Sequence, residues 1–136
     1  MRSLNKWTQS GGRLPKKIEL TLPEPPSINA YYRSIVIKGQ VRVLLSAEGR
    51  AYKQDVLAHW LRRPPAQRKA LEGPLAVHLA WHRARKVGDT DNRSKAVLDS
   101  LNGLAWMDDK QIVDLRITRH ESPRNGRLDL TIEAIE

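Results

Sequence analysis

Carboxylates gather in one short part of an otherwise basic chain. Five of the 15 acidic residues lie between Asp89 and Asp109, where only Arg93 and Lys95 are basic. This segment carries a net charge of −3, whereas the whole chain of 136 residues carries +9. A basic surface attracts a polyanion, and a group of carboxylates can hold a divalent cation against its phosphates. The pattern predicts a metal-dependent nuclease.

The spacing within this segment favours a shared site. Asp89 and Asp91 are two residues apart, so an extended backbone places both side chains on one side, where they can bind one cation or two. Asp91, Lys95 and Asp99 then follow at intervals of four, which forms one polar stripe on a predicted helix. Lys95 could neutralise charge in the transition state or orient the attacking water. We interpret Asp99 as a surface residue paired with Lys95.

A third carboxylate is needed, and Asp108 and Asp109, just before a predicted strand, can supply it. Carboxylate oxygens suit a hard ion such as Mg²⁺ or Mn²⁺, which lowers the pKa of bound water and polarises a phosphate. Two alternatives stay open: Asp91 is only a helix cap, and the Asp-Asp pair is only a turn. The Asp-x-Lys ending at Lys110 resembles a restriction-nuclease core, but that core needs the motif within a strand. The histidines lack ligand spacing and are interpreted as structural or surface groups: His59, His78, His82 and His120.

Composition excludes several other classes of protein. There is no cysteine, which excludes disulfides, thiolate zinc sites and thiol nucleophiles. No apolar run approaches a membrane span and no signal peptide is visible, so we expect a cytoplasmic protein without a membrane partner. A pI near 10.3 favours nucleic acid as the partner. The length predicts a single domain over residues 16–136, after a flexible N-terminal arm over residues 1–15.

The elements that position these residues follow from hydrophobic periodicity. Strands are predicted at 16–22, 75–81, 112–118 and 128–132, and a hairpin at 35–37 and 41–45 around Lys38-Gly39-Gln40. One helix begins after Ser46 and carries an apolar stripe of Tyr52, Val56, Leu57, Trp60 and Leu61. A second spans residues 92–102, with Gly103 at its C′ position and Val97, Leu98, Leu101 and Leu104 on one face. The sequence predicts an α+β fold, a mixed β-sheet with two main helices packed on it.

Aromatic and basic side chains mark the expected DNA contacts. An irregular loop after the first strand carries Tyr31 and Arg33, which could stack on bases or bind phosphate. The alternative is that the tyrosines only attach this loop to the core. Across the chain we expect seven residues to contact nucleic acid: Tyr31, Arg33, Lys38, Arg42, Arg85, Lys86 and Arg93.

Four segments together resemble the RusA family, small endodeoxyribonucleases of bacteria and prophages that resolve Holliday junctions. They are residues 22–33, residues 46–52, Asp89-Thr90-Asp91-Asn92 with Lys95, and residues 106–114 from Trp106-Met107-Asp108-Asp109 onward. The resemblance covers roughly residues 16–135. Two departures are visible. Val87-Gly88 separates the basic residues from the first aspartate, and the link before Trp106 is one residue shorter, so Asp108 stays a candidate metal ligand beside Asp109.

The resemblance implies a homodimer that uses Mg²⁺, without an organic cofactor, to nick four-way DNA junctions in pairs. It also implies three essential aspartates and an essential lysine, which fall on Asp89, Asp91, Asp109 and Lys95. The dimer interface would draw on apolar residues of the sheet and of the helix after Ser46. A non-catalytic protein that binds branched DNA fits the charge equally well, but the retained carboxylates and lysine argue against it.

Overall fold

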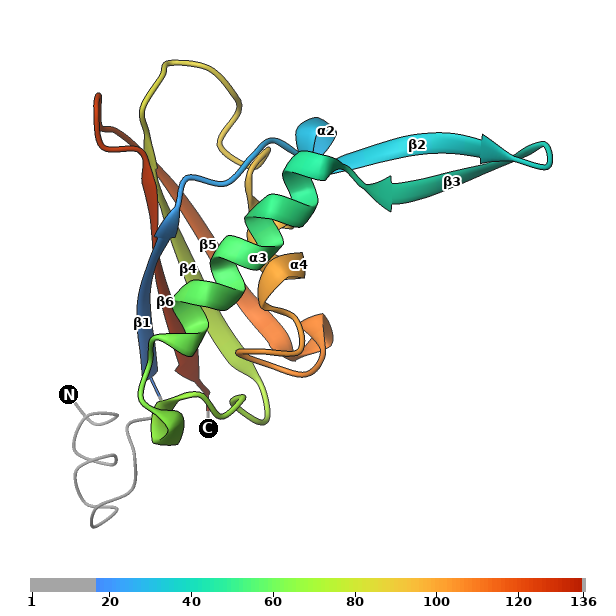
Figure 1. Cartoon of the computed structure of the whole chain (residues 1–136). Coiled ribbons are helices and arrows are strands. Elements are labelled where there is room, and N and C mark those ends of the chain that lie inside the picture. The colour runs from blue at the N-terminus through green and yellow to red at the C-terminus, as the bar shows by residue number, and fades with distance from the viewer. Residues whose placement is uncertain (1–16, 136) are drawn as a thin grey trace, which may run out of the picture.

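The computed structural model describes residues 17–135, so the predicted arm over residues 1–15 lies outside the described part of the chain. A four-stranded sheet has the order β1-β6-β4-β5 (Figure 1). Strand β6 (Arg127–Ala134) lies antiparallel to both β1 (Lys17–Pro23) and β4 (Leu75–Arg83). Strand β4 lies parallel to β5 (Ile112–Glu121). The prediction of a mixed sheet is therefore confirmed.

Helices α3 (Ala47–Leu61) and α4 (Ser94–Leu101) cover one face of this sheet (Figure 1). Alternate residues of β4 and β6 point under the helices and are buried, as expected for a sheet covered on one side. The largest buried side chains include Trp81, Trp106 and Tyr31. In the part of the chain that the structure describes, no helix is both long and apolar enough to cross a membrane.

The start of α3 confirms the predicted cap. Ser46 Oγ accepts a hydrogen bond from Gly49 N at 2.9 Å. Gly49 is required here because a Cβ at this position would lie 2.1 Å from the carbonyl oxygen of Tyr31. The predicted apolar stripe is too wide, since Leu57 and Leu61 are 40% and 52% exposed. The buried side chains Tyr52, Val56 and Trp60 follow at intervals of four along one line, and the two leucines lie one residue, about 100°, further round the helix.

The hairpin forms a second, two-stranded sheet that projects from the body of the molecule (Figure 1). Its strands are β2 (Tyr32–Ile37) and β3 (Gln40–Leu45). Lys38 and Gly39 form the turn with φ of 52° and 78°, the left-handed pair that a tight two-residue hairpin requires. The irregular loop predicted around the tyrosines is wrong, because a short helix α2 (Ile28–Tyr31) leads directly into β2.

Other boundaries also differ from the prediction. A short 3-10 helix η1 (Pro65–Gln67) lies between α3 and β4, and another, η2 (Asp109–Gln111), precedes β5. Helix α4 begins at Ser94 rather than at residue 92, because residues 90–93 form turns. Asp91 therefore lies before the helix, whereas Lys95 and Asp99 lie within it. Gly103, with φ of 88°, takes the predicted C′ position.

Candidate active site

Asp89 and Asp91 lie on the loop of residues 84–93 that joins the end of β4 to α4. Their main-chain oxygens form the turn, because Asp89 O accepts from Asn92 N at 3.1 Å and Asp91 O from Ser94 Oγ at 2.9 Å. Among the described residues their carboxylates are exposed and form no ion pair. The N-cap of α4 is Arg93, without a side-chain cap bond. The alternative that Asp91 only caps the helix is therefore wrong.

The buried Trp81 holds the C-terminal end of this loop through Arg93, and it contacts Glu24, which holds the N-terminal end by accepting from Ala84 N at 3.3 Å. Its indole Nε1 donates to Glu24 Oε2 at 2.9 Å, and the guanidinium of Arg93 lies 5.0 Å above its ring centroid. Arg93 also donates to the carbonyl oxygen of Pro25. At Gly88, where φ is 96°, a Cβ would lie 3.2 Å from the Trp81 ring. The loop is thus held against the core. Arg93 was expected to contact DNA, but its guanidinium contacts Trp81 and Pro25 instead.

Lys95 and Asp99 meet on the exposed side of α4. Lys95 Nζ lies 3.4 Å from Asp99 Oδ1, and their side chains are 55% and 24% exposed. The predicted pairing is confirmed, but Asp99 is more buried than the surface residue expected from the sequence. Burial raises the pKa of the Asp99 carboxyl, and the negative charge of Asp109 raises that pKa further. The fold therefore brings Asp99 within electrostatic reach of Asp109.

Asp108 and Asp109 have different partners although they are adjacent. Asp108 is the N-cap of η2, where its Oδ1 accepts from Lys110 N at 2.9 Å and Gln111 completes a capping box. Asp109 Oδ1 instead accepts a hydrogen bond from the indole Nε1 of Trp106 at 2.7 Å. The sequence offered the alternative that this Asp-Asp pair only forms a turn. That alternative describes Asp108, which caps η2, whereas Asp109 is oriented by the buried Trp106.

The available donors can be compared with what a divalent ion requires. Within residues 17–135, no three His, Cys, Asp or Glu side chains are arranged to hold a metal ion. The candidate donors are carboxylate oxygens of Asp89, Asp91 and Asp109, which are the hard ligands that Mg²⁺ prefers. Mg²⁺ usually takes one or two carboxylates and completes its shell with water and substrate phosphates. The chemistry of the donor set therefore fits Mg²⁺, and a preformed cage of three carboxylates is not required.

Tyr31 differs from the expectation for a residue that stacks on DNA. Its side chain is 1% exposed, and its hydroxyl lies 2.9 Å from Ser100 Oγ in the core. Burial raises the pKa of the Tyr31 phenol. The alternative holds for this residue, which attaches α2 to α4. Local sequence patterns do not predict this contact, because the partners are 69 residues apart.

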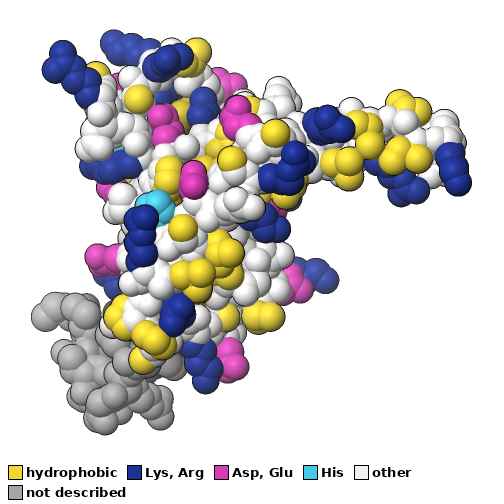
Figure 2. Space-filling view, viewed as in Figure 1, with side chains coloured by type: hydrophobic (Ala, Val, Ile, Leu, Met, Phe, Trp, Pro, Cys, Tyr) yellow, Lys and Arg dark blue, Asp and Glu magenta, His cyan; other side chains and the backbone are white. Residues whose placement is uncertain are grey.

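The other expected DNA-binding residues lie at the surface. Arg33, Lys38 and Arg42 are exposed on the projecting hairpin, and Arg85 and Lys86 are exposed on the loop before the carboxylates. The register pairs Ile35 with Arg42, so Arg33 and Arg42 lie on the same face of the hairpin. Figure 2 shows Lys and Arg side chains along the hairpin and on the loops above the sheet. These positions are compatible with phosphate contacts at two separate places.

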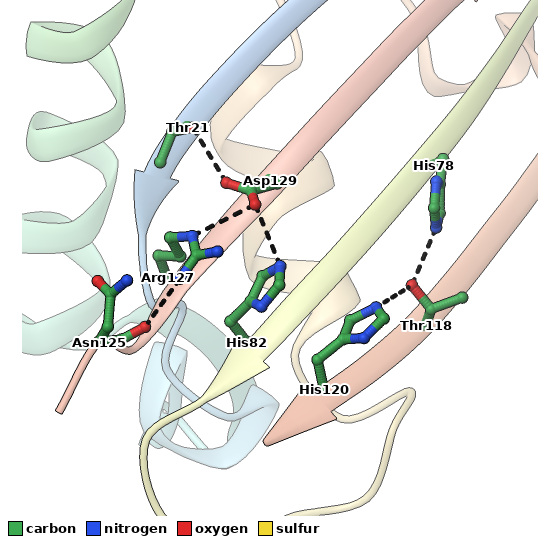
Figure 3. Close-up of polar contacts among 8 residues, drawn as sticks. All are labelled: Thr21, His78, His82, Thr118, His120, Asn125, Arg127 and Asp129. Carbon is green, nitrogen blue, oxygen red and sulfur yellow. Dashed lines mark hydrogen bonds and ion pairs between the residues drawn. The ribbon is translucent and has the colours of Figure 1, made fainter. Parts of the chain in front are cut away.

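The sheet face away from the helices carries a polar network that includes three of the histidines (Figure 3). His82 Nε2 lies 3.1 Å from Asp129 Oδ2. His78 and His120 both reach Thr118 Oγ1, at 2.9 and 3.1 Å. The rings of His82 and His120 stack with their centroids 4.8 Å apart. This arrangement agrees with the interpretation of these histidines as structural or surface groups.

The loop that follows β4 presents the exposed carboxylates of Asp89 and Asp91 together with the exposed Arg85 and Lys86, and this combination is compatible with a metal-dependent nuclease. Residues 23–133 match the family model described as Endodeoxyribonuclease RusA. The chain therefore belongs to the RusA family of endodeoxyribonucleases.

Curated relatives agree with this family. The chain is 37% identical over 115 residues to crossover junction endodeoxyribonuclease RusA of Escherichia coli K12. It is 36% identical to the proteins of that name from Shigella sonnei and Enterobacteria phage 82. Each of these matches covers 83% of this chain and 91% of the relative.

Proposed function

We propose that this protein is a Mg²⁺-dependent, structure-selective endonuclease that resolves Holliday junctions by paired hydrolysis of phosphodiester bonds. The observation that carries the proposal is the pair of exposed carboxylates of Asp89 and Asp91. Neither caps a helix, and both lie on the loop that carries Arg85 and Lys86. The relatives are named crossover junction endodeoxyribonucleases, which supports a branched DNA substrate. We also propose that it acts in the cytoplasm.

Each residue of the site has a distinct role in this proposal. Asp89, Asp91 and Asp109 would hold Mg²⁺, or Mn²⁺ in its place, and Asp108 would serve as the cap of η2. When bound, the metal supplies a polarised phosphate and a water of lowered pKa. Lys95 places its ammonium group near the scissile phosphate, where a fixed positive charge stabilises charge that develops in the transition state.

The basic residues would bind the junction arms. Arg85 and Lys86 lie directly before the carboxylates in the chain, so they would bind phosphates next to the cut. Arg33, Lys38 and Arg42 would bind phosphates further away, because the hairpin projects from the body (Figure 1). Such contacts carry affinity and orientation rather than base sequence.

Two symmetric cuts call for two related sites, so we propose a homodimer. The hairpin supports this proposal because one of its faces is apolar. The register pairs Val36 with Val41 and Ser34 with Val43 on that face. Val36, Val41 and Val43 are 69%, 69% and 64% exposed in the single chain. A two-stranded hairpin is only marginally stable in water by itself, so a second copy that covers this face would stabilise it.

The test is cleavage of a synthetic four-way junction and a linear duplex of matched sequence, each with Mg²⁺ and with EDTA. We expect cleavage of the junction only, and only with Mg²⁺. Asp91→Asn should abolish cleavage and keep or tighten junction binding, because a negative charge near phosphate is removed. Tight binding of the junction by the unaltered protein without any cleavage would favour the non-catalytic alternative. Full activity of Asp91→Asn would exclude Asp91 from the site.

A further inference from the structure

Trp106 combines complete burial with a hydrogen bond to a candidate site residue. Its side chain is 0% exposed, and its indole Nε1 lies 2.7 Å from Asp109 Oδ1. The main chain of Trp106 is also fixed, because its carbonyl oxygen accepts from Gly103 N at 2.7 Å and it forms a bridge with Asn102. The indole therefore cannot turn away from Asp109 without moving the turn that follows α4.

This bond couples the core to the site. A buried indole N–H needs an acceptor, since a donor that is withdrawn from water and left unpaired destabilises the fold. Within the described residues its acceptor is Asp109, and the other carboxylate oxygen, Oδ2, accepts no hydrogen bond there. A bond to a carboxylate is charge-assisted and short, so it restricts the rotation of the side chain. One oxygen of Asp109 is thus occupied, and the other accepts from no protein donor among the described residues.

The neighbouring Asp108 shows what this arrangement adds. Its carboxylate accepts from a backbone N–H of the exposed η2 turn. Of these two aspartates, Asp109 is the one that is held by a donor packed in the core. Removing a group that hydrogen-bonds to a metal ligand and orients it commonly lowers metal affinity or activity by about 10–100-fold.

We infer that Trp106 is a positioning residue for the reaction, which orients the Asp109 carboxylate so that Oδ2 can bind the divalent cation. The inference rests on the proposed function for the identity of the site, but it concerns a different residue. It explains why a tryptophan, rather than a purely apolar side chain, fills this core position. The spacing of three residues between Trp106 and Asp109 is the local feature that makes the contact possible.

The experiment compares Trp106→Phe with Trp60→Phe. Both change a buried tryptophan, since Trp60 is 3% exposed. Among the described residues Trp60 Nε1 donates no hydrogen bond, and it is not one of the buried unpaired atoms. We expect Trp106→Phe to weaken Mn²⁺ binding, measured by calorimetry on the protein–junction complex, by about 10–100-fold. The Mg²⁺ concentration for half-maximal cleavage should rise by a similar factor. Junction affinity in EDTA should stay unchanged, and Trp60→Phe should leave Mn²⁺ affinity unchanged.

A double-mutant cycle with Asp109→Asn separates positioning from a general effect on the core. If Trp106 acts through Asp109, Trp106→Phe should reduce Mn²⁺ affinity no further in the Asp109→Asn background. Should Trp106→Phe fail to fold, benzothienylalanine at this position keeps the shape of the ring and lacks the N–H. Equal losses for Trp60→Phe, additive effects in the cycle, or unchanged Mn²⁺ affinity would overturn the inference. The calorimetry tests the inference even if the unaltered protein binds junctions without cutting them.

Discussion

The surroundings of Asp99 in the structure indicate a role that its place in the sequence does not. In the sequence it is one more acidic residue on a polar stripe. In the structure its carboxylate contacts Lys95 and is three-quarters buried, and the charge of Asp109 acts on it. An ion pair that is partly withdrawn from water holds its partners more firmly than an exposed pair does. Asp99 is therefore placed to keep the ammonium group of Lys95 oriented.

Lys95 and Asp99 should differ in how strongly their replacement slows cleavage. Lys95→Ala should reduce the cleavage rate by about 10²-fold or more, because a preorganised charge is lost. Asp99→Asn should cost less than Lys95→Ala, but more than Asp114→Asn, an exposed carboxylate on β5 that serves as the matched control. Single-turnover cleavage of the junction measures all three variants. Equal rates for Asp99→Asn and Asp114→Asn would mean that the ion pair does not orient Lys95.

At the scale of elements, the loop of residues 84–93 has a rigid base and a charged, exposed part. Trp81 and Arg93 hold its ends, and Arg83 donates to the carbonyl oxygen of Gly88 at 3.1 Å. Arg83 also pairs with Glu121 at the end of β5. The exposed Arg85 and Lys86 are thus carried on an anchored loop. The carboxylates of Asp89 and Asp91 lie on this same loop.

Neutralising Arg85 and Lys86 together, each to Gln, should lower the slope of log junction affinity against log salt by roughly 2, about one for each lost phosphate contact. The control is the same double change at Arg62 and Lys69, which are exposed on the connection between α3 and β4, at the other end of the sheet (Figure 1). Binding titrations in EDTA at several salt concentrations measure both slopes. An unchanged slope for the first pair would place this loop away from the DNA.

His78, on the sheet face that the helices do not cover, should make the stability of the fold depend on pH. Partial burial lowers the pKa of His78 below its usual 6.5, and the charges of Arg116 and His120 lower it further. The unfolded chain therefore binds a proton more readily than the folded chain does. The contribution of His78 to stability should be complete above pH 6.5 and should be lost as the pH falls through its lowered pKa.

Urea unfolding at pH 7.5 and at lower pH, for the unaltered protein and His78→Gln, measures this contribution. The variant should lose less stability on acidification than the unaltered protein does. An identical pH dependence for the two proteins would show that His78 does not titrate differently on folding.

In the whole molecule, the projecting hairpin is the element whose apolar side chains a single chain leaves uncovered. One face carries Arg33 and Arg42 beside the partly exposed Ile37 and Leu44, and the other carries valines that are more exposed to water. The two faces therefore suit different partners, since arginine binds phosphate and valine gains stability from apolar contact. We expect the basic face to meet DNA and the apolar face to meet the second copy.

Sedimentation at micromolar protein without DNA should show a dimer, and a cruciform plasmid should be cut in both strands within one complex. Val41→Ser with Val43→Ser should shift the protein towards the monomer and give singly nicked circles. Ile35→Ser with Ile37→Ser, on the basic face, should leave the dimer intact. A monomeric unaltered protein that yields only nicked circles would contradict the resolvase proposal and leave a simpler nickase.

The sequence by itself determined the α+β class, the helix cap at Ser46 and the glycine turn of the hairpin, and it predicts the carboxylates and Lys95 as the site. These depend on periodicity and on local backbone geometry, which are properties of neighbouring residues. Only the tertiary structure decided that Tyr31 lies in the core and that Arg93 packs on Trp81. The hydrogen bond between Arg93 and Pro25 joins residues 68 apart in the chain, and the bond of Tyr31 spans 69 residues. Such contacts form because the core buries whichever side chains the folded elements bring together, and local patterns carry no information about that pairing.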